Sequence, residues 1–85
     1  MEEEFNRAVL RSKELTERPS NEDLLRLYAL FKQSTEGDIS GERPGGFDFK
    51  GAAKFDAWSK EQGKASDIAM QEYINLVNEL HNKEK

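Results

Sequence analysis

Three side chains of different chemistry, Tyr28, Phe31 and Lys32, stand at spacings of three and four residues. On a helix these spacings place them on one face. A phenol, a flat aromatic ring and an ammonium group side by side can hold a nucleotide that carries phosphate. The same residues can equally be two core aromatics beside a solvated lysine. The spacing by itself leaves both interpretations open.

Further lysines carry the same ambiguity. Lys50 and Lys54 form an i, i+4 pair, Lys54 shares a helical segment with Trp58, and Lys13 lies nearer the start of the chain. If these side chains converge, they form a cationic pocket with an aromatic shelf. Taken singly, an aromatic residue at helical spacing belongs to a core more often than to a ligand platform, and a helix lysine usually faces solvent. The residues alone therefore leave an anionic-ligand site as one of two alternatives.

The composition favours a single domain, residues 1–85, in the cytoplasm. The chain has no cysteine and one histidine, His81, which predicts no metal site and no cofactor. His81 has no evident orienting partner and is expected to be an ordinary surface residue. A formal net charge of -4 argues against a nucleic-acid partner. No apolar run is long enough to span a membrane, so stable membrane insertion is not expected.

The motifs for phosphate transfer and acyl carriage are incomplete. Gly46 and Gly51 match the glycine spacing of a P-loop, but alanines follow where its lysine and hydroxyl residue belong. A phosphopantetheine carrier needs a serine in an Asp-Ser-Leu-like setting, and Ser66-Asp67-Ile68 has the reverse order. No nucleophile stands beside an oriented base. We therefore expect a protein that is not an enzyme.

Helical periodicity and capping signals predict an all-α fold, since no segment alternates with a period of two. Ser20 with Asp23 has the pattern of a capping box, Gly37 is a stop signal and Asp48 can cap a later helix. The predicted helices cover residues 2–15, the segment from the Ser20 cap to Gly37, the segment from Asp48 to about residue 62, and residue 66 to near the C-terminus.

Two expectations concern the long loop and the third helix. Residues 37–48 have no periodicity, and Ile39 and Phe47 are expected to pin this loop to the body. The third helix is expected to pack through residues at three-residue steps, namely Phe49, Ala52, Phe55 and Trp58.

Three segments together resemble the acyl-CoA-binding protein family, without gaps and over nearly the whole chain. They are Tyr28-x-x-Phe31-Lys32-Gln33-x-Thr35-x-Gly37-Asp38, Glu42-Arg43-Pro44-Gly45 and Asp48-Phe49-Lys50-Gly51-x-Ala53-Lys54-Phe55-Asp56-Ala57-Trp58. The apolar pattern of the last helix, from Ala69 to Leu80, is similar too. Several motifs at fixed relative spacing make this likeness more specific than any one of them.

The resemblance implies a four-helix bundle with up-down-down-up topology that binds long-chain fatty acyl-CoA esters one to one. Such a protein acts as an intracellular acyl-CoA carrier and pool former. In the family, the positions that match Tyr28, Lys32 and Lys54 hold the ribose 3′-phosphate and neighbouring groups, and the position that matches Phe31 stacks on adenine. The positions that complete the nucleotide site match Lys13, Lys50 and Tyr73, and those along the acyl chain match Val9, Leu24, Leu25 and Ala53.

Four positions depart from the family pattern. Phe31 stands where tyrosine is usual, which keeps the stacking face and loses a hydroxyl. Phe55 replaces a tryptophan, and Ser12 replaces an apolar residue, so the first helix is expected to dock less tightly. Ala65 replaces a serine cap, and Ser66 is expected to cap one residue later.

The resemblance also implies how the protein meets its partners. It is expected to be a monomer that makes transient contact with acyl-CoA-using enzymes or membranes. The alternative hypothesis is a helical protein-interaction module that has kept the fold and weakened its ligand binding.

Overall fold

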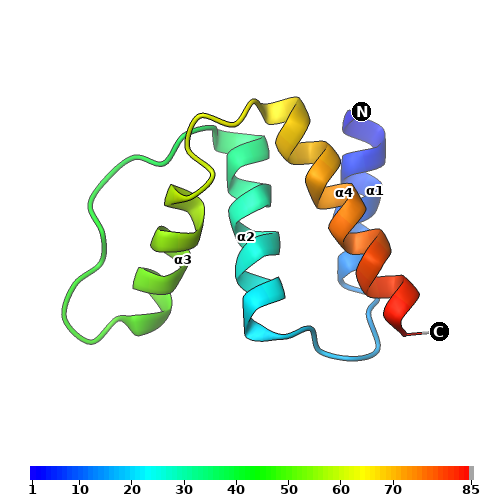
Figure 1. Cartoon of the computed structure of the whole chain (residues 1–85), viewed down its shortest axis with the longest axis horizontal. Helices are drawn as coiled ribbons and strands as arrows, with labels where there is room; N and C mark the ends of the chain where they lie inside the picture. The colour runs from blue at the N-terminus through cyan, green and yellow to red at the C-terminus, as the bar shows by residue number, and fades with distance from the viewer. Residues whose placement is uncertain (85) are drawn as a thin grey trace.

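Four α-helices make up the part of the chain that the structure, a computed structural model, describes, namely residues 1–84. They are α1 (Glu2–Ser12), α2 (Asn21–Glu36), α3 (Phe49–Ser59) and α4 (Ser66–Lys83), with no strand among those residues. Figure 1 shows α2 and α3 running in one direction, and α1 and α4 running in the other. The predicted all-α, up-down-down-up fold is confirmed.

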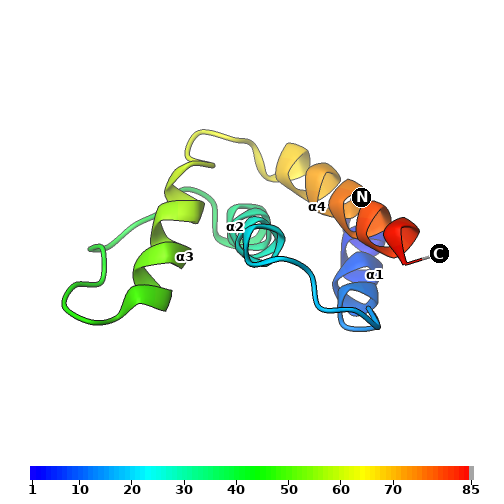
Figure 2. The ribbon, with the colours of Figure 1, turned by 60° about the horizontal axis from the view of Figure 1, so that its bottom comes forward.

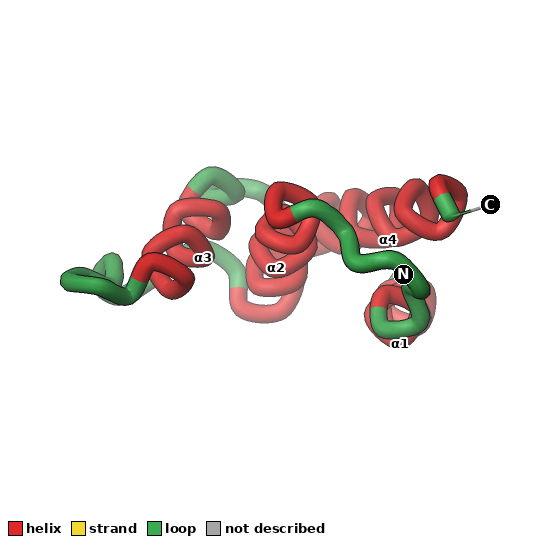
Figure 3. The backbone as a smooth tube through the Cα atoms, turned by 90° about the horizontal axis from the view of Figure 1, so that it is seen from below, coloured by secondary structure: helices red, strands yellow, loops and turns green. Residues whose placement is uncertain are grey.

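The central helix is α2. It packs against α4 on one side and α3 on the other, while α1 packs against α4. Figure 2 shows α2 nearly end-on between α3 and the pair formed by α4 and α1. Seen from below in Figure 3, α3 and its long loop again lie on the side of α2 opposite α1. The layout leaves α3 with one helical neighbour among the described residues.

The main core lies between α1, α2 and α4. Leu30 and Val77 are fully buried at its centre, and Phe5, Leu27 and Ile74 surround them. Within the described chain, no α3 residue belongs to this cluster. The helix α3 therefore forms a separate wall against α2, with Ala52 as its one buried residue.

The helix ends follow the predicted signals at α2 and α3. The Ser20 hydroxyl accepts a hydrogen bond from the Asp23 amide at 3.1 Å, and the Asp48 carboxylate accepts one from the Gly51 amide at 3.0 Å. Gly37 ends α2 with a φ of 81°, a left-handed conformation that glycine adopts readily. The predicted start of α4 at residue 66 is confirmed, but the prediction that Ser66 caps it was wrong, because Ala65 occupies the N-cap without a side-chain bond and Ser66 is already helical.

Two helices end earlier than predicted. The Ser12 hydroxyl donates to the Val9 carbonyl at 2.6 Å, and the amides of Lys13 and Glu14 bond to the carbonyls three residues back. The chain thus tightens from α-helical into turn bonding at Ser12, a residue whose hydroxyl competes for backbone groups. The end of α3 shows the same tightening, since the Glu61 amide bonds to the Trp58 carbonyl at 2.9 Å.

The long loop is held by polar contacts rather than by both predicted apolar residues. Ile39 is half-buried, but Phe47 is 91% exposed, so the prediction for Phe47 was wrong. Arg43 instead donates two hydrogen bonds to the Asp56 carboxylate, at 2.9 and 3.0 Å. This ion pair lowers the pKa of Asp56 and ties the loop to α3. Phe49 was also misplaced, because it is exposed rather than packed.

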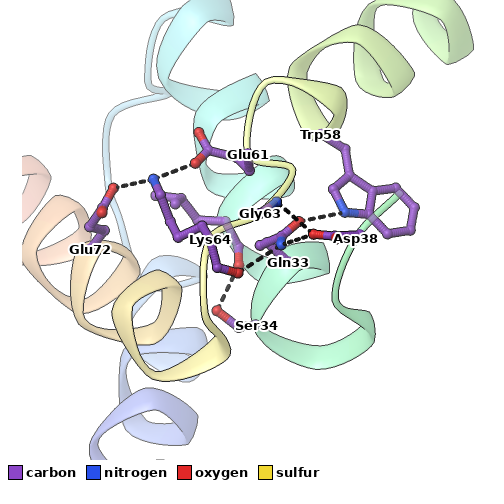
Figure 4. Close-up of polar contacts among 9 residues, drawn as sticks. Gln33, Ser34, Asp38, Trp58, Glu61, Gly63, Lys64 and Glu72 are labelled. Atoms are coloured by element: carbon purple, nitrogen blue, oxygen red, sulfur yellow. Dashed lines mark hydrogen bonds and ion pairs between the residues drawn. The ribbon is translucent and has the colours of Figure 1, made fainter. Parts of the chain in front are cut away.

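A polar network centred on the buried side chain of Gln33 joins one end of α2 to α3 and to the connection before α4 (Figure 4). Gln33 is 1% exposed, and its Nε2 donates to Asp38 Oδ1 at 2.9 Å and to the Lys64 carbonyl at 2.8 Å. The Trp58 indole N–H lies 3.2 Å from Gln33 Oε1 and donates to the Gly37 carbonyl at 2.9 Å. These bonds fix α3 against α2 at the end far from Asp48.

Candidate functional site

A groove of about 410 Å³ lies between α2 and α3. It brings together residues from the first half of α2 and the first half of α3, which run side by side in the same direction. Six of the candidate residues line it, namely Leu24, Leu25, Tyr28, Lys50, Ala53 and Lys54. The remaining lining residues were missed by the sequence analysis as site residues: Arg18, Asn21 and Phe49.

The groove combines apolar and cationic walls. Leu24, Leu25 and Ala53 supply aliphatic surface, and the ammonium groups of Lys50 and Lys54 supply positive charge. Such a lining suits an elongated molecule with an apolar part and an anionic part. Two of the missed residues could have been found from the sequence. Arg18 and Asn21 flank the Ser20 cap that begins α2, so they lie at the same end of α2 as Leu24 and Leu25.

Two cation–π contacts link α2 and α3. In one the cation belongs to α3 and the ring to α2, and in the other the cation belongs to α2 and the ring to α3. The Lys54 ammonium of α3 lies 5.2 Å from the centre of the Tyr28 ring of α2, and the Lys32 ammonium of α2 lies 5.1 Å from the Trp58 ring of α3. Spacing along each helix puts Lys32 beside Tyr28 and Lys54 beside Trp58, whereas the resemblance also groups Lys54 with Tyr28. The structure brings Lys54 to Tyr28, as the resemblance implies, and adds a contact between Lys32 and Trp58 that was not predicted, so each cation contacts the aromatic ring of the other helix.

The Lys32 ammonium also forms an ion pair with Glu36, one turn further along α2. The hydrogen bond to Glu36 raises the pKa of Lys32, while partial burial acts in the opposite direction. Lys32 therefore carries its positive charge throughout the neutral range. Because Lys32 lies one turn beyond Tyr28, it extends the cationic wall past the groove itself.

Phe31 and Tyr73 lie outside the groove lining, in an aromatic cluster with Phe5 of α1. The Phe31 ring stacks on Phe5 with centroids 5.9 Å apart, and its centroid lies 6.3 Å from that of Tyr73. Tyr73 is 4% exposed, and its hydroxyl donates to the Ser12 hydroxyl at 3.3 Å. Burial raises the pKa of the Tyr73 phenol. Ser12 thus gains a polar partner at the position where the resemblance leads one to expect an apolar contact.

Val9 and Lys13 lie on α1 and at its end, away from the groove lining. Val9 is half-buried against the core, and Lys13 is exposed at the C-cap of α1. His81, expected as an ordinary surface residue, is instead half-buried with its Nε2 2.7 Å from the Arg11 carbonyl oxygen. It connects α4 to the end of α1.

Two further features are absent from the described residues. Residues 1–84 contain no group of three or more His, Cys, Asp and Glu side chains that could hold a metal ion. None of the helices described is both long enough and apolar enough to cross a membrane.

The fold and the groove define a small four-helix protein whose groove, between two parallel helices, has a lining suited to an amphipathic anion. A model of the acyl-CoA-binding protein family matches residues 2–77. The chain belongs to this family.

Relatives from distant organisms support the assignment over most of their length. The acyl-CoA-binding protein homolog of Drosophila melanogaster is 51% identical over 78 residues, which cover 92% of this chain and 91% of the relative. The acyl-CoA-binding protein of Brassica napus is 48% identical, covering 94% and 87%. The crystal structure of Oryza sativa acyl-CoA-binding protein 2 superposes with a TM-score of 0.92 at 41% identity, covering 96% of this chain and 89% of that one.

Proposed function

We propose that this protein binds long-chain fatty acyl-CoA esters one to one and serves as a cytoplasmic carrier and pool former rather than as an enzyme. The observation that carries the proposal is the groove between α2 and α3, where Leu24, Leu25 and Ala53 lie beside the cations of Lys50 and Lys54. Family membership supports the same ligand, since the Drosophila melanogaster and Brassica napus relatives are named as an acyl-CoA-binding protein homolog and an acyl-CoA-binding protein. The protein acts as a monomer that sequesters the thioester and delivers it to acyl-consuming enzymes.

The polar and aromatic candidate residues contact the nucleotide end of the ligand. Tyr28, Lys32 and Lys54 hold the ribose 3′-phosphate, and the Phe31 ring stacks on adenine. A terminal phosphate carries about −1.5 to −2 charges at neutral pH, which explains why an acidic protein concentrates lysines here. The residues that complete this end are Lys13, Lys50 and Tyr73.

The acyl chain lies against the apolar wall of the groove. Leu24, Leu25 and Ala53 contact it, and Val9 contributes from α1. Each buried methylene contributes ~0.8 kcal/mol, so affinity rises with chain length. The alternative of an interaction module without a ligand gains no specific support, because the lysines and the aromatic shelf that such a module would have lost are all present.

Calorimetric titration with palmitoyl-CoA tests the proposal. We expect saturable heat with a stoichiometry near one and no release of free thiol on prolonged incubation. Absence of heat and of saturation at micromolar ligand would overturn the binding function, and thiol release would show an enzyme.

The phosphate assignment has a sharper test. Lys32→Ala and Lys54→Ala should each weaken palmitoyl-CoA binding by about 10-fold or more, since charge-assisted bonds contribute ~1.5–3 kcal/mol. The loss should be much smaller for a palmitoyl ester of dephospho-CoA, which lacks the 3′-phosphate. Equal losses for the two ligands would mean that these lysines do not contact that phosphate. Lys83→Ala, an exposed lysine on α4, is the control.

A further inference from the structure

An exposed aromatic pair stands where the long loop meets α3. Phe47 and Phe49 are 91% and 74% exposed, and their ring centroids lie 6.4 Å apart in an edge-to-face arrangement. They are the two most exposed large hydrophobic side chains in the described part of the protein. Rings in this position contribute almost nothing to the core, so their presence calls for another explanation.

The backbone around the pair has a defined conformation. Asp48 has φ −83° and ψ 71°, and the Phe49 amide donates to the Phe47 carbonyl at 2.9 Å, which together make an inverse γ-turn. The Asp48 side chain is turned onto the first turn of α3, where it caps the Gly51 amide. The turn and the cap therefore hold Phe47 and Phe49 together as neighbours on the surface.

The pair adjoins both the groove and its cations. Phe49 lines the groove together with Lys50 and Lys54, and Phe47 continues this apolar surface to the outside. Lys50 and Lys54 are exposed and lie one helical turn apart. Apolar rings flanked by lysines match the boundary of an anionic bilayer, where rings enter the headgroup region and lysines meet the lipid phosphates.

The size and shape of this surface favour a bilayer over a protein partner. The loop and the start of α3 form the outer edge of the molecule in Figures 1 and 3, on the side away from α1 and α4. Two aromatic side chains bury roughly 150–250 Å² each. A stable protein interface buries about 800 Å² on each partner. A fluid bilayer needs no matching pocket and accepts a small projecting surface.

We propose that Phe47 and Phe49, with Lys50 and Lys54, form a docking tip for transient contact with an anionic lipid bilayer. The tip lies at the end of the groove that Phe49 lines, so an acyl chain passes between bilayer and groove along apolar surface. This last step rests on the proposed acyl-CoA binding, whereas the lipid contact itself does not.

Flotation with lipid vesicles tests the contact without any acyl-CoA. Vesicles of phosphatidylcholine with phosphatidylserine are mixed with the wild-type protein, with Phe47→Ser, or with Ile68→Ser as the control. Ile68 is 52% exposed on α4, and neither Phe47 nor Ile68 lines the groove. We expect Phe47→Ser to lower the bound-to-free ratio about tenfold, equivalent to ~1.4 kcal/mol, and Ile68→Ser to leave it unchanged. Vesicles without phosphatidylserine should bind the wild type more weakly.

Several outcomes would overturn the docking tip. They are absence of flotation by the wild type, equal flotation of Phe47→Ser and the wild type, and equal binding to vesicles without phosphatidylserine. Self-association that Phe47→Ser abolishes in sedimentation would show a contact between two copies instead. A fall in palmitoyl-CoA affinity for Phe47→Ser would place Phe47 in the ligand site. Flotation by a wild type that binds no palmitoyl-CoA would leave the tip standing and refute the proposed function.

Discussion

Lys32 is the residue whose contacts in the structure differ most from its proposed role. Its ammonium pairs with Glu36, so a ligand phosphate must compete with that carboxylate. Glu36→Gln removes the competitor. Since an exposed ion pair contributes ~0–1 kcal/mol, affinity for palmitoyl-CoA should rise by up to about 5-fold, as measured by calorimetry. Glu79→Gln on α4 removes the same charge elsewhere, and an equal rise there would attribute the effect to net charge alone.

Phe31 is the second residue whose proposed contact with the ligand can be tested. One face of its ring stacks on Phe5, which positions the ring and leaves stacking rather than hydrogen bonding as its contribution. Phe31→Leu keeps an apolar side chain and loses the ring, so affinity for palmitoyl-CoA should fall by ~1–3 kcal/mol, or about 5- to 150-fold. Phe31→Tyr keeps the ring and should bind at least as tightly as wild type. If Phe31→Leu binds like wild type in calorimetric titration, the adenine lies elsewhere.

At the scale of elements, the stability of the first turn of α3 depends on the Asp48 cap and on the absence of a side chain at Gly51. A Cβ added at Gly51 would lie 2.3 Å from Asp48 Oδ2 and so would clash with the carboxylate whose Oδ1 makes the capping hydrogen bond. Asp48→Ala should cost ~1 kcal/mol of stability through loss of the cap. In a Gly51→Ala background the cap is already displaced, so the same substitution should cost clearly less. Urea unfolding of the four proteins measures this, and identical costs in both backgrounds would contradict it.

Asp38, in the connection between α2 and α3, should make the stability of the fold depend on pH. The Gly63 amide at 2.7 Å and then the Gln33 amide lower the pKa of Asp38 below its ordinary range. A carboxyl whose folded pKa is depressed stabilises the fold fully above its unfolded pKa, and this stabilisation is lost as pH falls through the folded value. Between about pH 5 and pH 2 the wild type should therefore lose more stability than Asp38→Asn. Urea midpoints across this range test it, and parallel losses would contradict it. Asp23→Asn is the control.

The elements also show what the sequence can and cannot predict. Ser20, Gly37 and Asp48 were predicted correctly because caps act within one turn of the chain. Phe47 and Phe49 were misplaced because the face that a loop residue or a first-turn residue presents depends on distant partners. Gln33 was overlooked as a structural residue, although it falls beside Leu30 and Ser34 on the buried side of α2. A polar residue on a buried face was the signal for the network in Figure 4.

The same limit applies to the candidate site at the scale of the molecule. Family motifs selected residues on α1, α2, α3 and α4, but spacing along one helix cannot show which side chains meet across an interface. The resemblance grouped Lys54 with Tyr28, which the structure brings into contact, but nothing in the sequence indicated that Lys32 contacts Trp58. Six candidates share the groove, while Phe31 and Tyr73 lie outside its lining, in the aromatic cluster with Phe5. A ligand that contacts all of these candidates must extend beyond the groove to the aromatic cluster.

The whole-molecule prediction concerns α3, which stands outside the main core and packs against α2 alone among the described helices. Local opening should therefore release α3 before α4, whose Ile74, Leu76 and Val77 are buried. In hydrogen exchange followed by mass spectrometry, amides of α3 should exchange faster than those of α4. Because palmitoyl-CoA would bridge α2 and α3, saturating ligand should slow exchange in α3 much more than in α4. Uniform slowing of exchange along the chain would contradict this. It would show that the ligand stabilises all four helices as one unit and that α3 does not open separately.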